Sequence, residues 1–377
     1  MTWKFHAAAL SGRVVHPSSR WSRPIATTPR HLLVPHWWRY LPAFGWTLRD
    51  GGSDPARWMS AAYTDRTLVT RAGPLHADRA TAGDHPEGLP TSSSTLPTLV
   101  VSMYQHAMIT DTSDVLCVTG TGYGTALLAA RLGDERVTSV DVDPYLVDTA
   151  RTRLDAIGHR PTLAVCDITG PLPGTYDRIV STVGLPGIPA SWLSALRPGG
   201  RLVTNLAGTG LVVAADVQPD GGARGQVTPE RAGFMRTRHA EDYPPPPSTR
   251  HAWTAEGETV TTGRYPVVQV KEAWELMTAY ALAVPGVHQG YDEDEKGIRT
   301  AVMVHADGSW ARATGRRGEP PTVHQTGPRQ LWDQLDAIRH DWLSDGQLPA
   351  HSASVEIDPG GTLHLRRGTW STTIPAP

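Results

Sequence analysis

The sequence predicts an α/β fold in which a mostly parallel sheet is covered by helices on both faces. Three observations lead to this prediction. Short apolar segments alternate with helical segments over residues 111–204, which is typical of βα units. A glycine-rich turn separates the first apolar run, residues 115–118, from the helical segment that follows. Residues 211–227 hold two strand-like runs around an Asp-Gly-Gly turn, which predicts an antiparallel hairpin closing one edge of the sheet.

Composition restricts the partners and the location of the protein. The chain has 377 residues, of which 39% are apolar, and a formal net charge of −2. This charge gives no reason to expect a nucleic acid or an anionic membrane surface as a partner. No apolar run approaches the roughly 18 residues of a membrane span, and the AAAL segment near the N-terminus is too short for a secretory core. We therefore expect a cytoplasmic protein with no nucleic-acid or membrane partner.

Three parts are expected along the chain. Residues 1–110 lack the βα alternation and predict an irregular N-terminal lid with short helices. Residues 111–240 hold the parallel sheet and its hairpin. Residues 241–377 form an additional α+β extension, because four successive prolines at residues 244–247 can continue neither a helix nor an interior strand.

Within the lid, Asp54 precedes a proline, which predicts an N-cap and a helix running to about Tyr63. Residues 73–95 are rich in Gly, Pro, Asp, Thr and Ser and predict a loop, and residues 99–108 predict a second helix.

The extension combines helix and hairpin signals. We expect a helix over residues 274–282 and an acidic surface loop over residues 292–296. The turns of two hairpins are expected at Asp307-Gly308 and at residues 358–361. A further amphipathic helix is expected because four apolar residues at spacings of four, three and four share one face. These residues are Leu331, Leu335, Ile338 and Trp342.

The glycine-rich turn predicts a nucleoside cofactor. Gly120, Gly122 and Gly124 allow a sharp turn and a close backbone approach to a ligand, and the next helix points its N-terminal amides into the same space. Asp141 ends the second strand about twenty residues later, where a carboxylate can accept both ribose hydroxyls. A dinucleotide or S-adenosylmethionine would each fit this much of the pattern.

The downstream order favours the second cofactor. Asp167 ends a third strand, where it can hold an adenine amino group, and the PGG turn at residues 198–200 leads into another strand. This order resembles class I methyltransferases, which implies a Rossmann-like sheet and S-adenosyl-L-methionine. The cofactor contacts implied are Thr119, Gly120, Thr121, Gly122, Gly124, Asp141, Val142, Asp167 and Ile168.

A run of hydroxyls, residues 92–95, precedes the glycine turn. These side chains could cap the helix that begins at Pro97, or line an active site, and the two roles are compatible. No Ser-His-Asp pattern or paired carboxylates indicate hydrolysis. Methyl transfer to a carboxylate needs neither, because the ionised acceptor is already a nucleophile that must only be aligned and kept from water.

No metal site is expected. Cys117 and Cys166 each lie in a predicted buried strand, where a cysteine usually acts as a small core hydrophobe, and no cysteine or histidine spacing near them matches a metal site.

The resemblance becomes more specific over about residues 20–230. ATTPRHLLVP at residues 26–35, AYTDRTLVT at residues 61–70, SSSTLP, the glycine turn and RPGGRLVT together are similar to protein-L-isoaspartate O-methyltransferases. The resemblance implies that Thr95 is the catalytic hydroxyl that contacts the acceptor carboxylate, with Ser94 and Ser93 as its neighbours.

The extension resembles that of a subfamily. DGSWA at residues 307–311 and GPRQLWDQLD at residues 327–336 are similar to actinobacterial homologues encoded beside clusters for lanthipeptides, lasso peptides and ATP-grasp-ligated peptides. This implies methylation of an aspartate in a constrained, macrocyclic precursor peptide, followed by aspartimide formation, with the extension recognising the peptide. Generic repair enzymes of the family are expected to lack such an extension.

Two departures from the family pattern keep alternatives open. In the glycine turn, Cys117 stands where the family has an acidic residue, and the turn is one residue shorter before Thr119. After the hydroxyl run, Leu96 replaces a small or polar residue. The alternatives are a repair enzyme for isoaspartyl proteins and a peptide-binding escort without cofactor affinity. A nicotinamide oxidoreductase is disfavoured because the glycines lack G-x-G-x-x-G spacing.

Overall fold

The computed structural model describes residues 2–239, 243, 246–348 and 350–377. The chain divides into two compact units. The first unit comprises Met1–Tyr243, Ser354–His364 and Thr373–Pro377, and the second comprises Pro244–Ala353 and Leu365–Thr372. The first division falls at the proline run, of which Pro244 and Pro245 lie outside the described residues.

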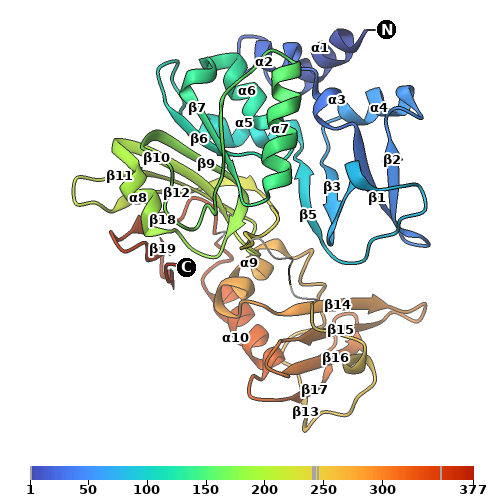
Figure 1. The fold of residues 1–377 in the computed structure, drawn as a ribbon. Coiled ribbons are helices and arrows are strands. Elements are labelled where there is room, and N and C mark those ends of the chain that lie inside the picture. Colours follow the sequence, from blue (N-terminus) through green and yellow to red (C-terminus); the bar gives the residue numbers. More distant parts are fainter. Residues whose placement is uncertain (1, 240–242, 244–245, 349) are drawn as a thin grey trace. The chain divides into compact units, whose positions relative to one another are not determined.

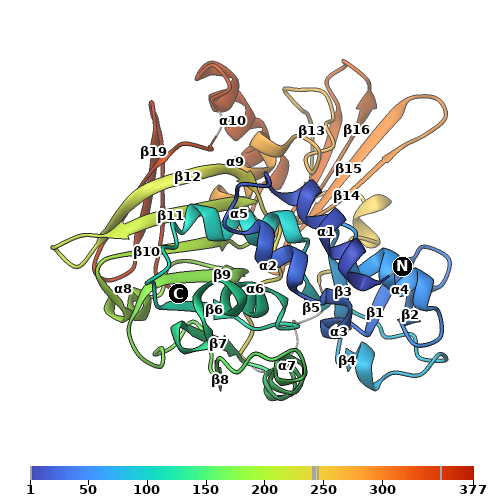
Figure 2. The ribbon, with the colours of Figure 1, turned by 90° about the horizontal axis from the view of Figure 1, so that it is seen from above.

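A parallel sheet forms the centre of the first unit (Figure 1, Figure 2). Its strands pair in parallel in the order β10-β9-β6-β7-β8. The strands are β6 (Val115–Val118), β7 (Val137–Asp141), β8 (Thr162–Val165), β9 (Tyr176–Leu185) and β10 (Leu196–Leu206). The helices between and before them are α5 (Pro97–His106), α6 (Tyr123–Leu132), α7 (Pro144–Ala156) and α8 (Ala190–Ala195). The predicted α/β fold with a parallel sheet is therefore confirmed.

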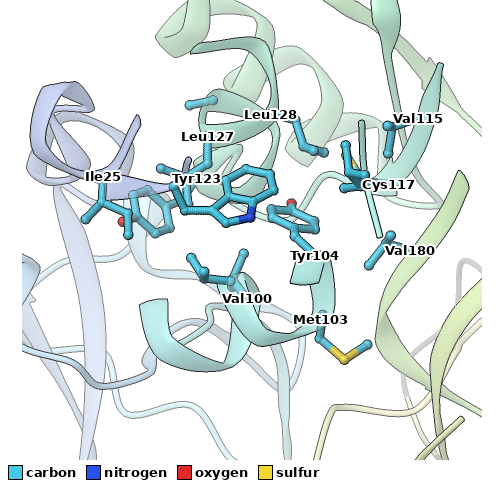
Figure 3. Close-up of a cluster of buried hydrophobic side chains, with 14 of the residues drawn as sticks. Ile25, Val100, Met103, Tyr104, Val115, Cys117, Tyr123, Leu127, Leu128 and Val180 are labelled. Atoms are coloured by element: carbon cyan, nitrogen blue, oxygen red, sulfur yellow. The ribbon is translucent and has the colours of Figure 1, made fainter. Parts of the chain in front are cut away.

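Both faces of the central strands are buried. Figure 3 shows one face, where Val115 and Val180 of the sheet share a hydrophobic core with Leu127 of α6 and Val100 of α5. The neighbouring residues along β6, β9 and β10 point to the opposite face of the sheet. They include Leu116, Ile179 and Leu202, which are also fully buried. Burial on both faces accounts for the short, continuously apolar strand segments of the sequence.

The predicted hairpin is present as β11 (Leu211–Val217) and β12 (Ala223–Arg231). It does not close the sheet, because β18 (Ser354–Ile357) pairs antiparallel with β12. β19 (Leu363–Arg367) and β20 (Trp370–Ile374) follow β18 in the strand order. The expectation that hairpin residues form an edge was therefore wrong, and part of the expected extension belongs to the first unit. The returning strand pairs with residues 223–226 of β12 and so covers the first part of the edge that the hairpin would otherwise leave open.

The lid contains more regular structure than predicted. The helix at Asp54 is present as α4 (Pro55–Ala62), with Asp54 accepting the N–H of Arg57 at 3.0 Å, and α5 occupies the place of the second predicted helix. The other helices are α1 (Trp3–Val14), α2 (Ser22–Thr27) and α3 (Arg30–Leu33).

An antiparallel sheet in the lid was missed by the sequence analysis. It comprises β1 (His36–Leu41), β2 (Gly45–Asp50), β3 (Leu68–Ala72), β4 (Leu75–His76) and β5 (Pro90–Ser94). The loop predicted for residues 73–95 is thus wrong at both ends. The polar residues of β5 are extended because they pair with β3, with Val69 opposite Ser93.

The second unit has an antiparallel sheet and two longer helices. Its hairpin at Asp307-Gly308 is confirmed, but Asp292 and Glu293 of the predicted acidic loop belong to a strand. The strands run in the order β13-β17-β16-β15-β14. The elements are β13 (Thr259–Thr262), α9 (Trp274–Ala283), β14 (His288–Glu293), β15 (Ile298–Val304), β16 (Trp310–Arg316), β17 (Thr322–Thr326) and α10 (Leu331–Ser344). Among the helices formed by the described residues of either unit, none has the length and apolar character to cross a membrane.

Candidate functional site

The first unit contains a cavity of about 290 Å³ at the carboxyl ends of its parallel strands. In open α/β sheets, ligands bind at this edge. Eleven of the twelve predicted site residues line the cavity; Gly122 does not. Those that line it are Ser93, Ser94, Thr95, Thr119, Gly120, Thr121, Gly124, Asp141, Val142, Asp167 and Ile168.

Two glycines shape the turn in different ways. Gly122 has a φ of +84°, in the left-handed region that favours glycine, and it starts α6. Gly124 has an ordinary φ, but a Cβ atom there would lie 2.5 Å from the hydroxyl of the buried Tyr104. Gly122 is therefore required by the backbone, and Gly124 by the close packing of α6 on Tyr104.

Asp141 holds the glycine turn. Its Oδ2 accepts the N–H of Gly120 at 3.0 Å, and its Oδ1 accepts the N–H of Asp143 at 3.1 Å. Burial raises the pKa of Asp141, and these two N–H groups act in the opposite direction. A carboxylate offers about four acceptor positions, so two remain for ribose hydroxyls.

Hydroxyl groups support the turn from beneath. The Ser139 hydroxyl lies 2.7 Å from that of Thr119 and 2.9 Å from that of Thr125. Cys117 is buried against Thr125, and burial raises the pKa of its thiol, as expected for a core cysteine. Cys166 differs from the prediction, because β8 ends one residue before it and its side chain lines the cavity.

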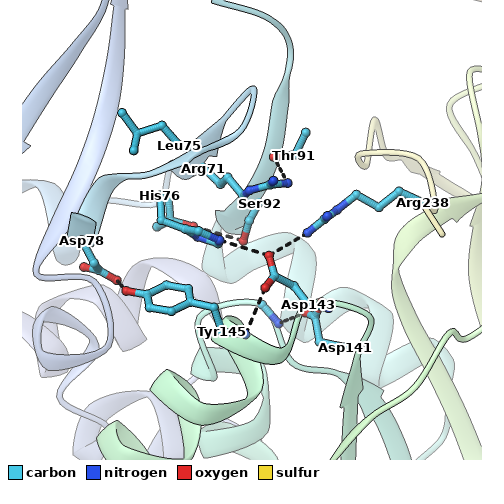
Figure 4. Close-up of polar contacts among 12 residues, drawn as sticks. Arg71, Leu75, His76, Asp78, Thr91, Ser92, Asp141, Asp143, Tyr145 and Arg238 are labelled. Carbon is cyan, nitrogen blue, oxygen red and sulfur yellow. Dashed lines mark hydrogen bonds and ion pairs between the residues drawn. The ribbon is translucent and has the colours of Figure 1, made fainter. Parts of the chain in front are cut away.

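Asp143 joins three parts of the first unit (Figure 4). It caps α7 by accepting the N–H of Tyr145 at 3.0 Å. Its Oδ2 lies 3.1 Å from Nε2 of His76 in β4 and accepts Nη2 of Arg238 at 2.9 Å. Burial alone would raise the pKa of Asp143, but His76 and Arg238 hold it well below its ordinary value. The sequence indicated only the capping role of Asp143, because an aspartate before a proline is typical of a helix N-cap. It gave no sign of the contacts with His76 and Arg238.

Residues 232–239, which follow β12, form part of the cavity wall and were missed by the sequence analysis. Met235 and Thr237 hydrogen-bond to the backbone of Gly184 at the end of β9, at 2.7 and 2.9 Å. Arg238 pairs with Asp143 at 2.9 Å. The segment has no apolar periodicity, so its position depends on these contacts rather than on a sequence pattern. It contributes Gly233, Phe234, Met235, Arg236, Thr237 and Arg238 to the lining.

Asp167 already has partners. Its Oδ1 accepts the N–H of Thr169 at 2.9 Å and the Thr169 hydroxyl at 2.7 Å, and its Oδ2 pairs with Nδ1 of the exposed His239. Burial acts to raise the pKa of Asp167, but Thr169 and His239 lower it overall. An adenine amino group would therefore share Oδ2 with His239 or displace it.

The hydroxyl run lines the cavity, with residues 92–94 in strand β5 and Thr95 directly after it. Ser94 is buried, and its hydroxyl accepts Nη2 of Arg30 at 3.3 Å. Ser93 and Thr95 are half-buried in the cavity wall, which leaves them as the hydroxyls open to an acceptor. The alternative that the run caps α5 was wrong, because Asp65 accepts the N–H of Thr98 at 2.9 Å.

Arg30, from the PRH segment, holds the end of β5 in place. Its guanidinium is fully buried and donates to the carbonyl of Thr95 at 3.1 Å and to that of Ser94 at 3.3 Å. It also donates to the carbonyls of Ala62, Thr64 and Arg66 at 2.9 to 3.1 Å. Burial lowers the pKa of Arg30 to about 10, so the group stays charged at neutral pH. The sequence marked this segment as a motif but gave no role to the arginine.

The sequence relatives identify the family. A family profile described as "Protein-L-isoaspartate(D-aspartate) O-methyltransferase (PCMT)" matches residues 62–222. The protein-L-isoaspartate O-methyltransferase of Salinibacter ruber is 34% identical over 181 residues, which cover 43% of this chain and 74% of that protein. The chain belongs to the protein-L-isoaspartate O-methyltransferase family. Homologues in this family are S-adenosylmethionine-dependent carboxyl O-methyltransferases.

Other relatives match over shorter stretches. The protein-L-isoaspartate O-methyltransferase of Thermococcus onnurineus is 34% identical over 126 residues, 32% of this chain and 57% of that protein. That of Methanopyrus kandleri is 38% identical over 89 residues, 22% of this chain and 39% of that protein. The chain thus spans about half the length of these two family members.

A solved structure titled protein-L-isoaspartate O-methyltransferase shares the fold. It aligns over 100% of both chains with a TM-score of 0.51 at 14% identity. This alignment supports the α/β methyltransferase fold.

Proposed function

We propose that this protein is an S-adenosylmethionine-dependent O-methyltransferase that esterifies an aspartyl side-chain carboxylate of a modified ribosomal peptide. The observation that carries the proposal is that one cavity brings the hydroxyls of Ser93 and Thr95 together with the glycine turn and Asp141. The family to which the chain belongs supports the methyl donor and the carboxyl acceptor.

The cavity walls fit the methyl donor. Asp141 keeps two acceptor positions for ribose hydroxyls, and Asp167 lies at the next strand end for an adenine amino group. The glycine turn lies close to β5, since a Cβ atom at Gly120 would lie 3.3 Å from the carbonyl oxygen of Ser93. Glycine therefore keeps the space between the turn and β5 free of a side chain. When bound there, S-adenosylmethionine supplies an electrophilic methyl group.

The residues of this chain would orient the acceptor and exclude water. The hydroxyls of Thr95 and Ser93 can donate to an acceptor carboxylate without the positive charge that would reduce its nucleophilicity. Leu96, Leu99 and Phe234 supply apolar wall around them. No general base is needed, because the acceptor is ionised at neutral pH. Alignment and dehydration are therefore the contributions of the protein.

The fate of the ester follows from peptide chemistry. In a constrained peptide, the next backbone nitrogen can attack the ester carbonyl, methanol leaves, and an aspartimide forms, which water can open to isoaspartate. We propose that a macrocyclic precursor peptide is the partner and that the second unit recognises it.

Two alternatives are tested by the same measurements. The repair of isoaspartyl proteins is consistent with the family, and an escort that binds the peptide without catalysis would need no methyl donor. Calorimetry with S-adenosylmethionine comes first, followed by mass spectrometry of isoaspartyl peptides for the gain of one methyl group. Binding without methylation of linear isoaspartyl peptides supports the peptide-modifying function, methylation of them supports repair, and absence of binding supports the escort.

Replacing Asp141 with alanine is expected to weaken S-adenosylmethionine binding by about 10- to 100-fold. Hydrogen bonds to a charged group contribute about 1.5–3 kcal/mol, and Asp141 also holds the N–H of Gly120. Calorimetry measures the change. The matched control is Asp148→Ala, an exposed carboxylate of α7. If the two variants bind S-adenosylmethionine with equal affinity, Asp141 does not contact the cofactor.

A further inference from the structure

A second cavity lies within the second unit, between α9, α10 and the residues around Trp370. Its volume is about 180 Å³, below the usual 300–1,000 Å³ of sites for drug-sized molecules, so it suits a single side chain. No residue of the proposed methyltransferase site lines it. It therefore needs an explanation of its own.

The apolar stripe of α10 leads into this cavity. Leu331 and Leu335 at the start of the helix are fully buried in the core of the second unit. Ile338 and Trp342, on the same face, are only partly buried and line the cavity, and Ile338 also packs against that core. The face that the sequence predicts to be apolar is thus completely buried over its first half and only partly buried over its second half.

Indole rings form two of the walls. Trp342 and Trp370 both line the cavity. The Nε1 atom of Trp342 is buried and has no hydrogen-bond partner in the part of the chain that the structure describes. Because this N–H is buried, Trp342 offers its ring to the cavity rather than a hydrogen-bond donor.

The charge of the cavity is negative. Asp341 and Asp345 line it, and no hydrogen bond or ion pair to either carboxylate is found among the described residues. Glu275 adds a third carboxylate, which accepts the N–H of Ala350 at 3.0 Å. The one cation in the lining, Arg367, is held by the carbonyl of His351.

The end of α10 increases this negative potential. A helix carries partial negative charge at its C-terminus, and cations are the residues that stabilise it there. The last turn of α10 has no basic residue, and Asp345 is its C-cap. Two unpaired aspartates at this end are therefore unfavourable in the free protein, and a bound cation would relieve their repulsion.

We infer that this cavity binds a basic side chain, Lys or Arg, of the acceptor peptide. The cation would lie against the faces of Trp342 and Trp370 and near the carboxylates of Asp341 and Asp345, an arrangement that combines cation–π attraction with ion pairing. This inference rests on the proposed function, because the peptide is the proposed partner of the second unit. It adds the class of residue that the peptide carries outside its reacting aspartate.

The test uses two small probes and the full chain. N-acetyl-L-arginine methylamide and N-acetyl-L-citrulline methylamide have nearly the same shape, but only the first is charged. Each is titrated into isotopically labelled protein, and the indole N–H signal of Trp342, assigned with Trp342→Phe, reports occupancy. The arginine probe is expected to bind at least about tenfold more tightly than the citrulline probe.

Charge-neutralising variants complete the test. Asp341→Asn/Asp345→Asn is expected to weaken binding of the arginine probe by at least about tenfold, since it removes the two unpaired carboxylates. The control, Glu295→Gln/Glu319→Gln, removes the same charge from exposed positions of the second unit. Equal binding of the two probes, or equal effects of the two double variants, would overturn the inference.

The two proposals can fail separately. The probe experiment involves no methyl donor and no methyl transfer. If the protein binds S-adenosylmethionine but not the arginine probe, the inference about this cavity is refuted and the proposed function stands. If the protein binds the arginine probe but not S-adenosylmethionine, the inference about the cavity is supported and the proposed methyltransferase function is refuted.

Discussion

Replacing Arg30 with methionine is expected to lower kcat/KM for methyl transfer by at least about a hundredfold and the melting temperature by on the order of 10 °C. The variant leaves the buried carbonyls of Ser94 and Thr95 without their donor, together with those of residues 62, 64 and 66. A buried acceptor that loses its donor costs about 1–3 kcal/mol, and several of these carbonyls lose theirs together. The hydroxyls of Ser93 and Thr95 would also shift, and a displacement of about 1 Å is enough for a hundredfold loss of rate.

The affinity for S-adenosylmethionine separates this effect from general unfolding. At a temperature where the variant is folded, calorimetry should give an affinity within about threefold of the original, because no cofactor contact implied for the site involves Arg30. Arg30→Lys keeps the charge but lacks the planar fork, so it should show the same direction of change. Arg57→Met, on the exposed side of α4, is the control. A variant of Arg30 with unchanged kcat/KM would contradict its role in positioning β5.

The neighbouring His31 is expected to make the stability of the protein dependent on pH. His31 is buried, with its Nδ1 at 2.7 Å from the hydroxyl of Tyr63, and burial lowers its pKa from 6.5 to about 4. Between these values the unfolded chain binds the proton and the folded protein does not, so the free energy of unfolding falls as the pH falls. This group should cost about 2 kcal/mol on going from pH 7 to about pH 4.5.

Urea denaturation at the two pH values measures this effect. His31→Phe removes the titrating group. Between the two pH values, the free energy of unfolding of this variant should therefore fall by about 2 kcal/mol less than that of the original protein. His16→Phe, at an exposed position of the lid, should behave like the original. An identical pH dependence of the His31 variant and the original would show that the folded protein binds this proton as readily as the unfolded chain.

The elements that local sequence determines were predicted well. The glycine turn, the strand before it and the hairpin of β11 and β12 depend on positive φ angles, short apolar runs and turn residues, all of which are visible in the sequence. The helix at Asp54 was equally visible, since its N-cap and first-turn proline are adjacent.

Elements that depend on distant partners could not be predicted. β5 is entirely polar from Thr91 to Ser94, and it is a strand only because β3 supplies its hydrogen bonds. Residues 232–239 lack any periodicity, and Gly184 and Asp143 fix them through contacts across the first unit. The role of Arg30 was hidden for the same reason, because its acceptors are backbone carbonyls, which every sequence provides.

The return of β18 to β12 has a consequence for synthesis of the protein. The ribosome makes residues 244–353 between these two strands, so the nascent first unit must wait with the outer edge of β12 open until residues 354–357 emerge. An open edge is a template for pairing with other chains. The second unit is thus an insertion that delays completion of the sheet, and a fragment ending at Tyr243 should aggregate where the whole chain does not.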